Sequence, residues 1–425
     1  MRQFTPGCLA LLLCAATAQS QDPNKAVRIG LTYDPRSKPG VVVLPVNGPG
    51  ADSIRAILQR DFDFGGRIAI VQYDAAAGDT TADGLPNWKL LSQLGAVAAV
   101  QATPTATGLH VAVYDVVRKQ TPLVRDYNAP AMSESRAWRA KVHDIADDLE
   151  GSLTGTRGIS CTRVLFERSR QIWVVDSDGE QVTQVSELGN PLSAAWHPGG
   201  AMIAYGTYRP AQIVVHDLNT GTKHPVAIGS GSYTTPAFSP DGSSVLYAHG
   251  VDDGYDLYSA PLDGSASRRL SVGRGSDNIS PSMSPDGRRI AFMSARAGHP
   301  EIYTMDADGT NPDLLTPQDF APLAYRAKPN WSPDGRTVAF QSRVSGRFQV
   351  MSIALRDRSV RQLTSDGTNE DPSWAPDGRH LVFTSNRGGS LQLWILDTET
   401  GRARQLTRGT ASRRGMWSPR LGGKG

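Results

Sequence analysis

The sequence has little cysteine, no concentration of charge of one sign and no long apolar segment, and each shortage excludes a class of protein. Only three of the 425 residues are cysteine, at positions 8, 14 and 161. Two of them lie at the extreme N-terminus, so a disulfide framework is excluded, and we expect Cys161 in a buried strand. The formal net charge is +3 without a dense Lys/Arg run, which argues against a nucleic-acid-binding surface. No segment reaches the roughly 20 apolar residues that a membrane-spanning helix needs.

Residues 1–18 have the pattern of a secretory signal peptide. Arg2 supplies the positive start, CLALLLCAA a short apolar core, and Ala16-Thr17-Ala18 the cleavage pattern. We therefore expect an exported protein whose mature chain begins near Gln19. A lipoprotein signal that modifies Cys14 is the alternative, although the preceding leucine is larger than the residue such a signal requires.

Residues 19–153 mix strand and helix signals. The run VRIGLTY (27–33) predicts a strand, and ADSIRAILQRDF (51–62) places apolar residues at helical spacing. A further helix is predicted over residues 133–153, where the apolar stripe has the same period. These signals predict a small α/β domain, followed by a linker rich in Gly, Ser and Thr at residues 154–160.

The rest of the chain repeats one phrase, of which NWSPDGRTVAFQS (330–342) is an example. The prolines of the repeats fall at positions 198, 240, 285, 333, 376 and 419, so the period is 42 to 48 residues. Each repeat indicates four short strands joined by tight turns, and Asp-Gly pairs suit such turns because both residues tolerate positive φ. This pattern predicts an all-β six-bladed β-propeller over residues 161–419, with a tail at residues 420–425.

The two ends of the repeat region complement each other. Residues 163–188 resemble the last three strands of a repeat, and MWSPR (416–420) supplies a repeat start with no strands after it. We predict that they form one blade together, which closes the ring without open edges. The large apolar residue before each repeat proline is expected to fill the space between blades: Trp196, Phe238, Met283, Trp331, Trp374 and Trp417.

Motifs for catalysis and metal binding are missing from the sequence. There is no G-x-S-x-G, no phosphate-binding loop and no H-E-x-x-H. The stretches DSDG (176–179) and DADG (306–309) lack the remaining ligands of a calcium loop. The sequence therefore predicts a binding scaffold without catalytic residues, cofactor or metal. An exported propeller that acts as a hydrolase or lyase, or that binds carbohydrate, is the alternative, because catalytic carboxylates need not form a sequence motif.

The whole arrangement resembles the TolB family, the periplasmic propeller proteins of the Tol–Pal cell-envelope system. The stretches GVVVLPVNGPG, LGAVAAVQATPT, LHVAVYDVV and DDLEGSLTGTRGISCTRVLF are similar to the family's N-terminal domain and junction in order and spacing. The resemblance implies a non-enzymatic periplasmic protein that supports outer-membrane integrity and constriction at cell division. We expect a monomer that neither binds nucleic acid nor inserts into a membrane.

The resemblance also implies two protein partners. A Pal-like outer-membrane lipoprotein would bind the propeller, and a TolA-like inner-membrane protein would bind the processed N-terminus, here Gln19, Ser20, Gln21 and Asp22.

The segments that lead into the innermost strands should rim one mouth of the propeller channel. The family's Pal contacts fall in these segments and correspond to Tyr233, Thr235, Asn278 and Ser280 in this chain. We expect Asn278 to be a central contact, because its amide both donates and accepts hydrogen bonds. The rim geometry adds six charged candidates: Arg326, Lys328, Glu370, Asp371, Arg413 and Arg414.

Overall fold

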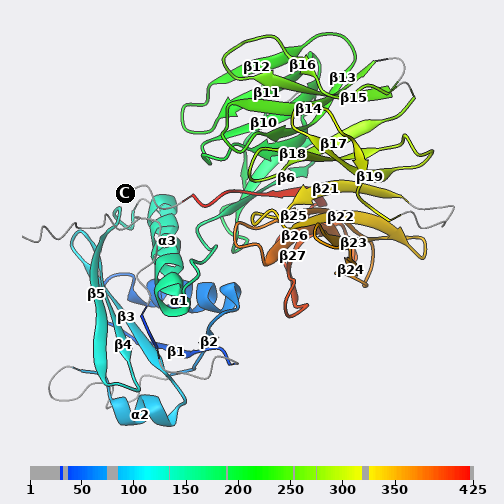
Figure 1. Ribbon diagram of the computed structural model, residues 1–425. Coiled ribbons are helices and arrows are strands. Elements are labelled where there is room, and N and C mark those ends of the chain that lie inside the picture. Colours follow the sequence, from blue (N-terminus) through cyan, green and yellow to red (C-terminus); the bar gives the residue numbers. More distant parts are fainter. Residues whose placement is uncertain are drawn as a thin grey trace, which may run out of the picture.

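The computed structural model describes residues 29–31, 37–73, 85–133, 135–187, 190–251, 254–273, 275–317 and 325–421. Figure 1 shows an α/β unit beside a disc of six sheets, which confirms the predicted fold class. The predicted signal peptide and the candidate N-terminal contacts Gln19, Ser20, Gln21 and Asp22 lie outside the described residues. Among the helices of the described ranges, none combines the length and the apolar character needed to cross a bilayer.

The α/β unit is a five-stranded sheet with helices on both faces. Its elements are β1 (Gly40–Val43), α1 (Ala51–Gly65), β2 (Ala69–Ile70), α2 (Trp88–Gln93), β3 (Ala98–Thr105), β4 (Gly108–Asp115), β5 (Gln120–Asn128) and α3 (Ser135–Thr154). The strand order is β2-β1-β3-β4-β5, with β1 parallel to both neighbours and the remaining pairs antiparallel.

Helices α1 and α3 share one core with the sheet. Ile54 and Leu58 of α1 and Val142 and Leu149 of α3 recur at helical spacing and are buried against the sheet residue Val100. Residues on the other face of the sheet pack against α2.

The strand predicted over residues 27–33 is wrong where it can be checked, because residues 29–31 belong to no strand. The backbone N–H of Ile29 instead donates to the carbonyl of Ser152 in α3, at 2.8 Å. This segment therefore packs along the helix and does not extend the sheet.

The disc consists of six four-stranded antiparallel sheets, each ordered from an innermost to an outermost strand. Blade 1 is β9 (Leu192–Trp196), β10 (Met202–Tyr208), β11 (Ala211–Asp217) and β12 (Lys223–Ile228), and blade 2 is β13 (Ser232–Phe238), β14 (Ser244–Val251), β15 (Gly254–Pro261) and β16 (Arg268–Arg269). Blade 3 is β17 (Asn278–Met283), β18 (Arg289–Ser294), β19 (Glu301–Asp306) and β20 (Asp313–Leu314), and blade 4 is β21 (Arg326–Trp331), β22 (Thr337–Val344), β23 (Arg347–Ala354) and β24 (Val360–Gln362). Blade 5 is β25 (Asn369–Trp374), β26 (His380–Ser385), β27 (Gln392–Asp397) and β28 (Ala403–Gln405).

Blade 6 combines the two ends of the propeller sequence. It contains β29 (Ser412–Trp417) as the innermost strand, followed by β6 (Arg163–Arg168), β7 (Gln171–Asp176) and β8 (Thr183–Gln184). β29 pairs antiparallel with β6, with Trp417 opposite Val164. The expectation for Cys161 is wrong in detail: this residue is half-buried in the bend before β6, where its N–H donates to Asp147 at 2.9 Å.

Large apolar residues fill the spaces between the blades, as the repeat pattern predicts. Trp196, Phe238, Trp331 and Trp417 are at most 9% exposed and belong to clusters that join neighbouring sheets. The corresponding Met283 and Trp374 are half-buried and pack against two further clusters.

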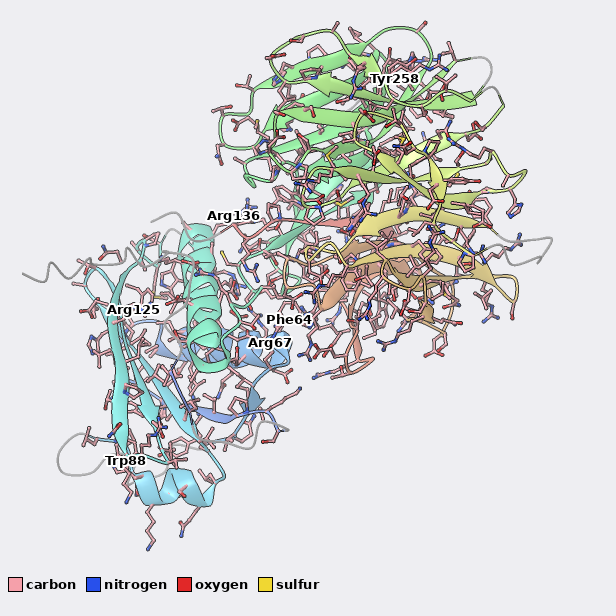
Figure 2. All side chains as sticks on the ribbon, viewed as in Figure 1. Phe64, Arg67, Trp88, Arg125, Arg136 and Tyr258 are labelled. Carbon is pink, nitrogen blue, oxygen red and sulfur yellow. The ribbon has the colours of Figure 1, made fainter. Side chains whose placement is uncertain are left out.

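The α/β unit contacts the propeller on the face that carries the Pro-Asp-Gly turns. Figure 2 places Phe64 and Arg67 at this junction. The guanidinium of Arg404 stacks over the Phe64 ring at 3.6 Å, and Arg67 forms an ion pair with Asp377 at 3.3 Å. Because these contacts lie on the turn side of the disc, the face on which the innermost strands begin points away from the junction.

Candidate binding site in the propeller channel

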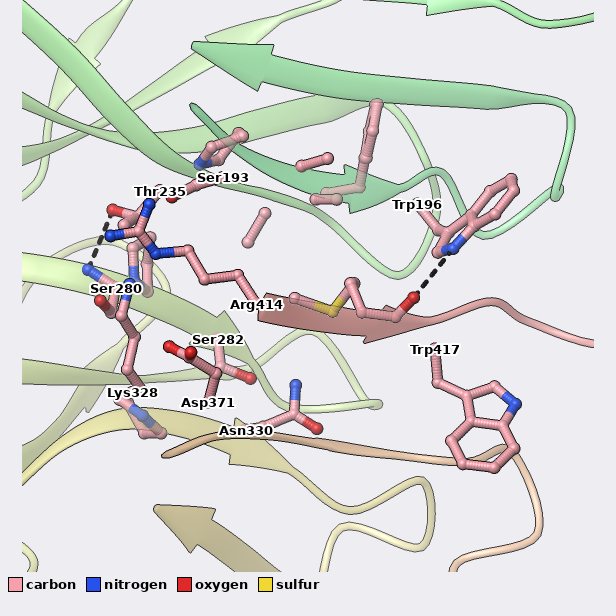
Figure 3. A pocket seen from close by; sticks show the side chains of 18 of the residues that line it. Ser193, Trp196, Thr235, Ser280, Ser282, Lys328, Asn330, Asp371, Arg414 and Trp417 are labelled. Carbon is pink, nitrogen blue, oxygen red and sulfur yellow. Dashed lines mark hydrogen bonds between the residues drawn. The ribbon is translucent and has the colours of Figure 1, made fainter. Parts of the chain in front are cut away.

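A cavity of about 280 Å³ follows the propeller axis and is lined by the innermost strands of all six blades. One residue per blade surrounds its end on the face where these strands begin, and each lies three positions before the large apolar residue of its repeat. We call these six residues the collar: Ser193, Thr235, Ser280, Lys328, Asp371 and Arg414. Figure 3 shows the collar side chains at one end of the cavity, with Trp196 and Trp417 at the other.

An unusual backbone conformation places every collar side chain. All six residues have left-handed φ angles, between 46° and 57°, which non-glycine residues seldom adopt. At each of these points the ladder between the first and second strands shifts register, so every innermost strand contains a bulge. A proline follows the collar residue in blades 2 to 5. Because proline has no backbone N–H to donate to the ladder, it is confined within sheets to positions such as these bulges.

Side chains of neighbouring blades hold the collar backbone in place. The N–H of Ser280 donates to Thr235 Oγ1 of the preceding blade at 3.0 Å. The N–H of Arg414 donates to Thr384 of blade 5 at 2.9 Å, and that of Ser193 donates to Glu167 of blade 6 at 2.8 Å. The collar is therefore a feature of the closed ring and does not belong to any single blade.

The charges of the collar are concentrated in one half of the ring. Blades 1 to 3 contribute short hydroxyl side chains, whereas blades 4 to 6 contribute Lys328, Asp371 and Arg414. Arg414 forms an ion pair with Glu167 at 2.9 Å, and Asp371 accepts a hydrogen bond from Thr384 at 3.2 Å. Burial lowers the pKa of the Lys328 ammonium, while the negative charge of Asp371 acts in the opposite direction.

The predicted rim residues divide into three groups. Thr235, Ser280, Lys328, Asp371 and Arg414 all belong to the collar, so half of the ten candidates lie together around the cavity. Glu370 and Arg413 each precede a collar residue and are half-buried and exposed, respectively. The remaining candidates, Tyr233, Asn278 and Arg326, are buried within the blades and do not line the cavity, whereas the equally buried Thr235 and Ser280 do.

Tyr233, Asn278 and Arg326 have partners inside the protein. Tyr233 stacks on His249 with ring centres 4.3 Å apart, and Arg326 binds both carboxylate oxygens of Glu301 at 2.8 and 2.9 Å. Asn278 is completely buried, and its amide nitrogen donates to Asp256 at 3.1 Å. The expectation that Asn278 presents an accessible side chain is therefore wrong, because the start of its strand turns into the blade. Contact between a partner and any of the ten rim candidates stays a prediction.

Ser193 completes the collar but was not among the predicted site residues. Its repeat reads LSAAWHP, so the proline that follows the collar residue in four other blades is missing. Counting three positions back from Trp196 would have found it.

Exposed apolar side chains lie on the same face of the disc as the collar. Tyr208 and Val251 are both 54% exposed at the ends of second strands, and Ile228 is 63% exposed at the end of a fourth strand. Val272 and Tyr325 are exposed just before the innermost strands of blades 3 and 4. Antiparallel pairing brings all five positions to the collar side, beside blades 1 to 4. Repeat patterns do not reveal this exposure, because such residues look like ordinary strand residues in the sequence.

The described ranges contain no group of three or more His, Cys, Asp or Glu side chains arranged to hold a metal ion.

Sequence comparison connects the chain with known proteins. A family model described as "TolB beta propeller domain" matches residues 151–421. The chain is also 32% identical over 179 residues to the Tol-Pal system protein TolB of Bordetella pertussis, an alignment that covers 40% of this chain. The chain spans 41% of the length of that relative.

Structural comparison extends the similarity to the α/β unit. The crystal structure of TolB from Acinetobacter baumannii is similar with a TM-score of 0.77 and 26% identity, covering 92% of this chain and 99% of that chain. A nidogen/laminin complex structure gives a TM-score of 0.51 at 12% identity, with 60% of this chain and 98% of that chain covered, and shares the fold alone. With six repeats, a closed ring and a family match over residues 151–421, this chain belongs to the TolB beta propeller domain family.

Proposed function

We propose that this protein is a non-enzymatic, periplasmic protein-binding component of a Tol–Pal system. The collar face of the propeller docks a Pal-like outer-membrane lipoprotein. The processed N-terminus, beginning near Gln19, engages a TolA-like inner-membrane protein. Through these contacts the protein supports outer-membrane integrity and constriction at cell division. The names of the matched relatives support this assignment.

One observation carries the proposal for the collar face: a cavity and a group of exposed apolar side chains lie together on it. Protein interfaces combine an apolar centre with polar groups that fix the orientation of the partner. Ile228 and Val251 supply apolar surface, and the collar supplies the polar groups. The α/β unit contacts the opposite face, so a partner reaches the collar without displacing it.

The test is calorimetry of the mature protein with the Pal-like lipoprotein of the same organism. Ile228→Glu should weaken binding about tenfold or more, because a charge replaces an exposed apolar side chain at the proposed interface. The melting temperature should not change, since Ile228 is 63% exposed.

Val360→Glu is the matched control. Val360 is 41% exposed at the start of a fourth strand, which places it on the opposite side of the disc. This variant should bind as tightly as the parent. Equal loss in both variants would contradict docking on the collar face, and a parent protein that does not bind would contradict the proposed function.

A further inference from the structure

The cations around the collar differ in whether the protein already provides a carboxylate for them. Arg414 is paired with Glu167 at 2.9 Å, and Arg326 is paired with Glu301 at 2.8 Å. Both carboxylates are almost completely buried, with side-chain exposures of 6% and 2%. These two arginines are therefore neutralised from within the propeller.

Lys328 has no such partner. Its side chain lines the cavity and is half-buried, and its ammonium makes no ion pair or hydrogen bond with any residue that the structure describes. Asp371 is the acidic member of the collar, but its carboxylate accepts a hydrogen bond from Thr384 and forms no ion pair with Lys328. The charges of Asp371, Glu167 and Glu370 favour the protonated ammonium from a longer range and do not outweigh its burial. A partly buried charge without a partner is unfavourable, so an added acceptor at this position would be stabilising.

The shape of the collar leaves room for an acceptor to reach Lys328. Ser193, Thr235 and Ser280 are short, and they lie at the same end of the cavity as Lys328 (Figure 3). Four of the five exposed apolar residues lie at the blades that carry these short side chains, and Tyr325 lies just before blade 4. A partner seated on that apolar surface can therefore extend a polar group across the cavity. Because an ammonium only donates hydrogen bonds, the group that it prefers is an anion.

We propose that the collar binds a carboxylate of the docked partner, either an Asp or Glu side chain or a C-terminal carboxylate, through the ammonium of Lys328. This inference rests on the proposed function and adds the chemistry that the partner presents. The left-handed backbone at Lys328, with φ of 56°, and the proline that follows it fix the base of the side chain. The ammonium is thus positioned before the partner arrives, which reduces the entropy lost on binding.

The first experiment compares the parent with Lys328→Met and Lys328→Arg by calorimetry against the Pal-like lipoprotein. Lys328→Met should weaken binding about tenfold or more, with an unchanged or higher melting temperature, because the unpaired charge is gone. Lys328→Arg keeps the charge and should retain part of the affinity. Lys89→Met, at an exposed position of α2, is the control and should bind like the parent.

Variants of the lipoprotein identify the source of the carboxylate. Its Asp and Glu residues are changed singly to Asn and Gln, and a further form carries a C-terminal amide. The form that lacks the relevant carboxylate should bind the parent about tenfold more weakly and bind Lys328→Met with no further loss. If Lys328→Met binds within twofold of the parent, the inference is overturned while the proposed function stands.

A second measurement does not need the partner. The lysines are reductively methylated with ¹³C, which keeps their charge, and their NMR signals are followed while succinate is added. The Lys328 signal, identified by its loss in Lys328→Met, should shift at lower succinate concentration than the signal of the exposed Lys89. Equal responses of the two signals would overturn the inference even if the lipoprotein does not bind and the proposed function has failed.

Discussion

At the scale of single residues, positions two apart in an innermost strand have opposite roles. Ser280 faces the cavity, whereas Asn278 points into the blade and accepts a hydrogen bond from Arg296 at 3.2 Å. Blade 5 repeats the arrangement, because Asn369 is also completely buried and accepts from Arg387 at 3.1 Å. The buried asparagines therefore hold the starts of their strands in place, and the collar residues two positions later, Ser280 and Asp371, line the cavity.

Asn278→Ala should destabilise the protein without affecting partner binding directly. The substitution removes the hydrogen bonds that the buried Asn278 amide makes with Asp256 and Arg296, so the free energy of unfolding should fall by about 1–3 kcal/mol. Urea denaturation measures this change. Asn219→Ala, in an exposed turn, is the control and should stay within about 0.5 kcal/mol of the parent. An equally stable Asn278→Ala variant that no longer binds the lipoprotein would show that Asn278 contacts the partner after all.

At the scale of secondary-structure elements, β29 completes the ring. It pairs with β6, more than 240 residues earlier in the sequence, and the N–H of Trp417 donates to Ser373 of blade 5 at 3.1 Å. The indole N–H of Trp417 also donates to Thr162 at 2.9 Å. β29, which also carries the collar residue Arg414, therefore joins blade 5 to the start of β6.

Ending the chain after residue 411 should destabilise the propeller strongly. This truncation removes β29, exposes the edge of β6 and removes the buried Trp417, whose loss alone is expected to cost about 3–5 kcal/mol. Thermal unfolding by circular dichroism should show a clearly lower melting temperature. Removal of residues 422–425 alone serves as the control. If the longer truncation melts with the parent, β29 does not stabilise the closed ring.

At the scale of the whole molecule, buried ionisable groups join the α/β unit to the propeller. His143 of α3 lies 2.7 Å from Asp61 of α1 and 3.4 Å from Asp178 of the propeller. Glu150 of α3 lies 3.6 Å from Arg67, which also pairs with Asp377 of blade 5. The junction therefore depends on the protonation of groups that belong to both units.

The pKa values of these groups predict that stability falls as the pH rises. Burial raises the pKa of Asp147 to about 7 and that of Glu150 to about 8. Burial works to lower the pKa of His143, but Asp61 and Asp178 outweigh it and raise that pKa to about 9. For all three groups the folded protein binds its proton more tightly than the unfolded chain. The stability linked to these protons is therefore complete below the ordinary pKa of each group and is lost as the pH rises through its folded pKa.

Unfolding should accordingly become easier by about 2 kcal/mol or more between pH 6 and pH 9, as measured by urea denaturation. Glu150→Gln keeps the shape of the side chain and removes its titration, so the slope of stability against pH should become shallower above pH 6. Glu180→Gln, on the propeller surface, should leave the slope as it is in the parent. A free energy of unfolding that rises from pH 6 to pH 9 would contradict the raised pKa values of Asp147, Glu150 and His143.

Much of the architecture could be predicted from the sequence, because turns and hairpins depend on residues that are close together in the chain. The Pro-Asp-Gly turns and alternating apolar residues specify hairpins, and the three-residue spacing from Lys328 to Trp331 recurs in all six blades. A four-stranded sheet with two apolar faces must stack on neighbours, so the ring and the packing of Trp196 and Trp331 were predictable.

Only the tertiary structure decided which residues face the channel and which carry unpaired charge. Asn278 and Ser280 are indistinguishable as polar residues before a repeat, and the bulge at Ser280 sends one into the blade and the other into the cavity. Lys328 and Arg326 are likewise similar in the sequence, but only the arginine is reached by Glu301, a contact between residues 25 positions apart. Burial and pairing depend on where distant segments meet, and that is a property of the closed ring that no single repeat contains.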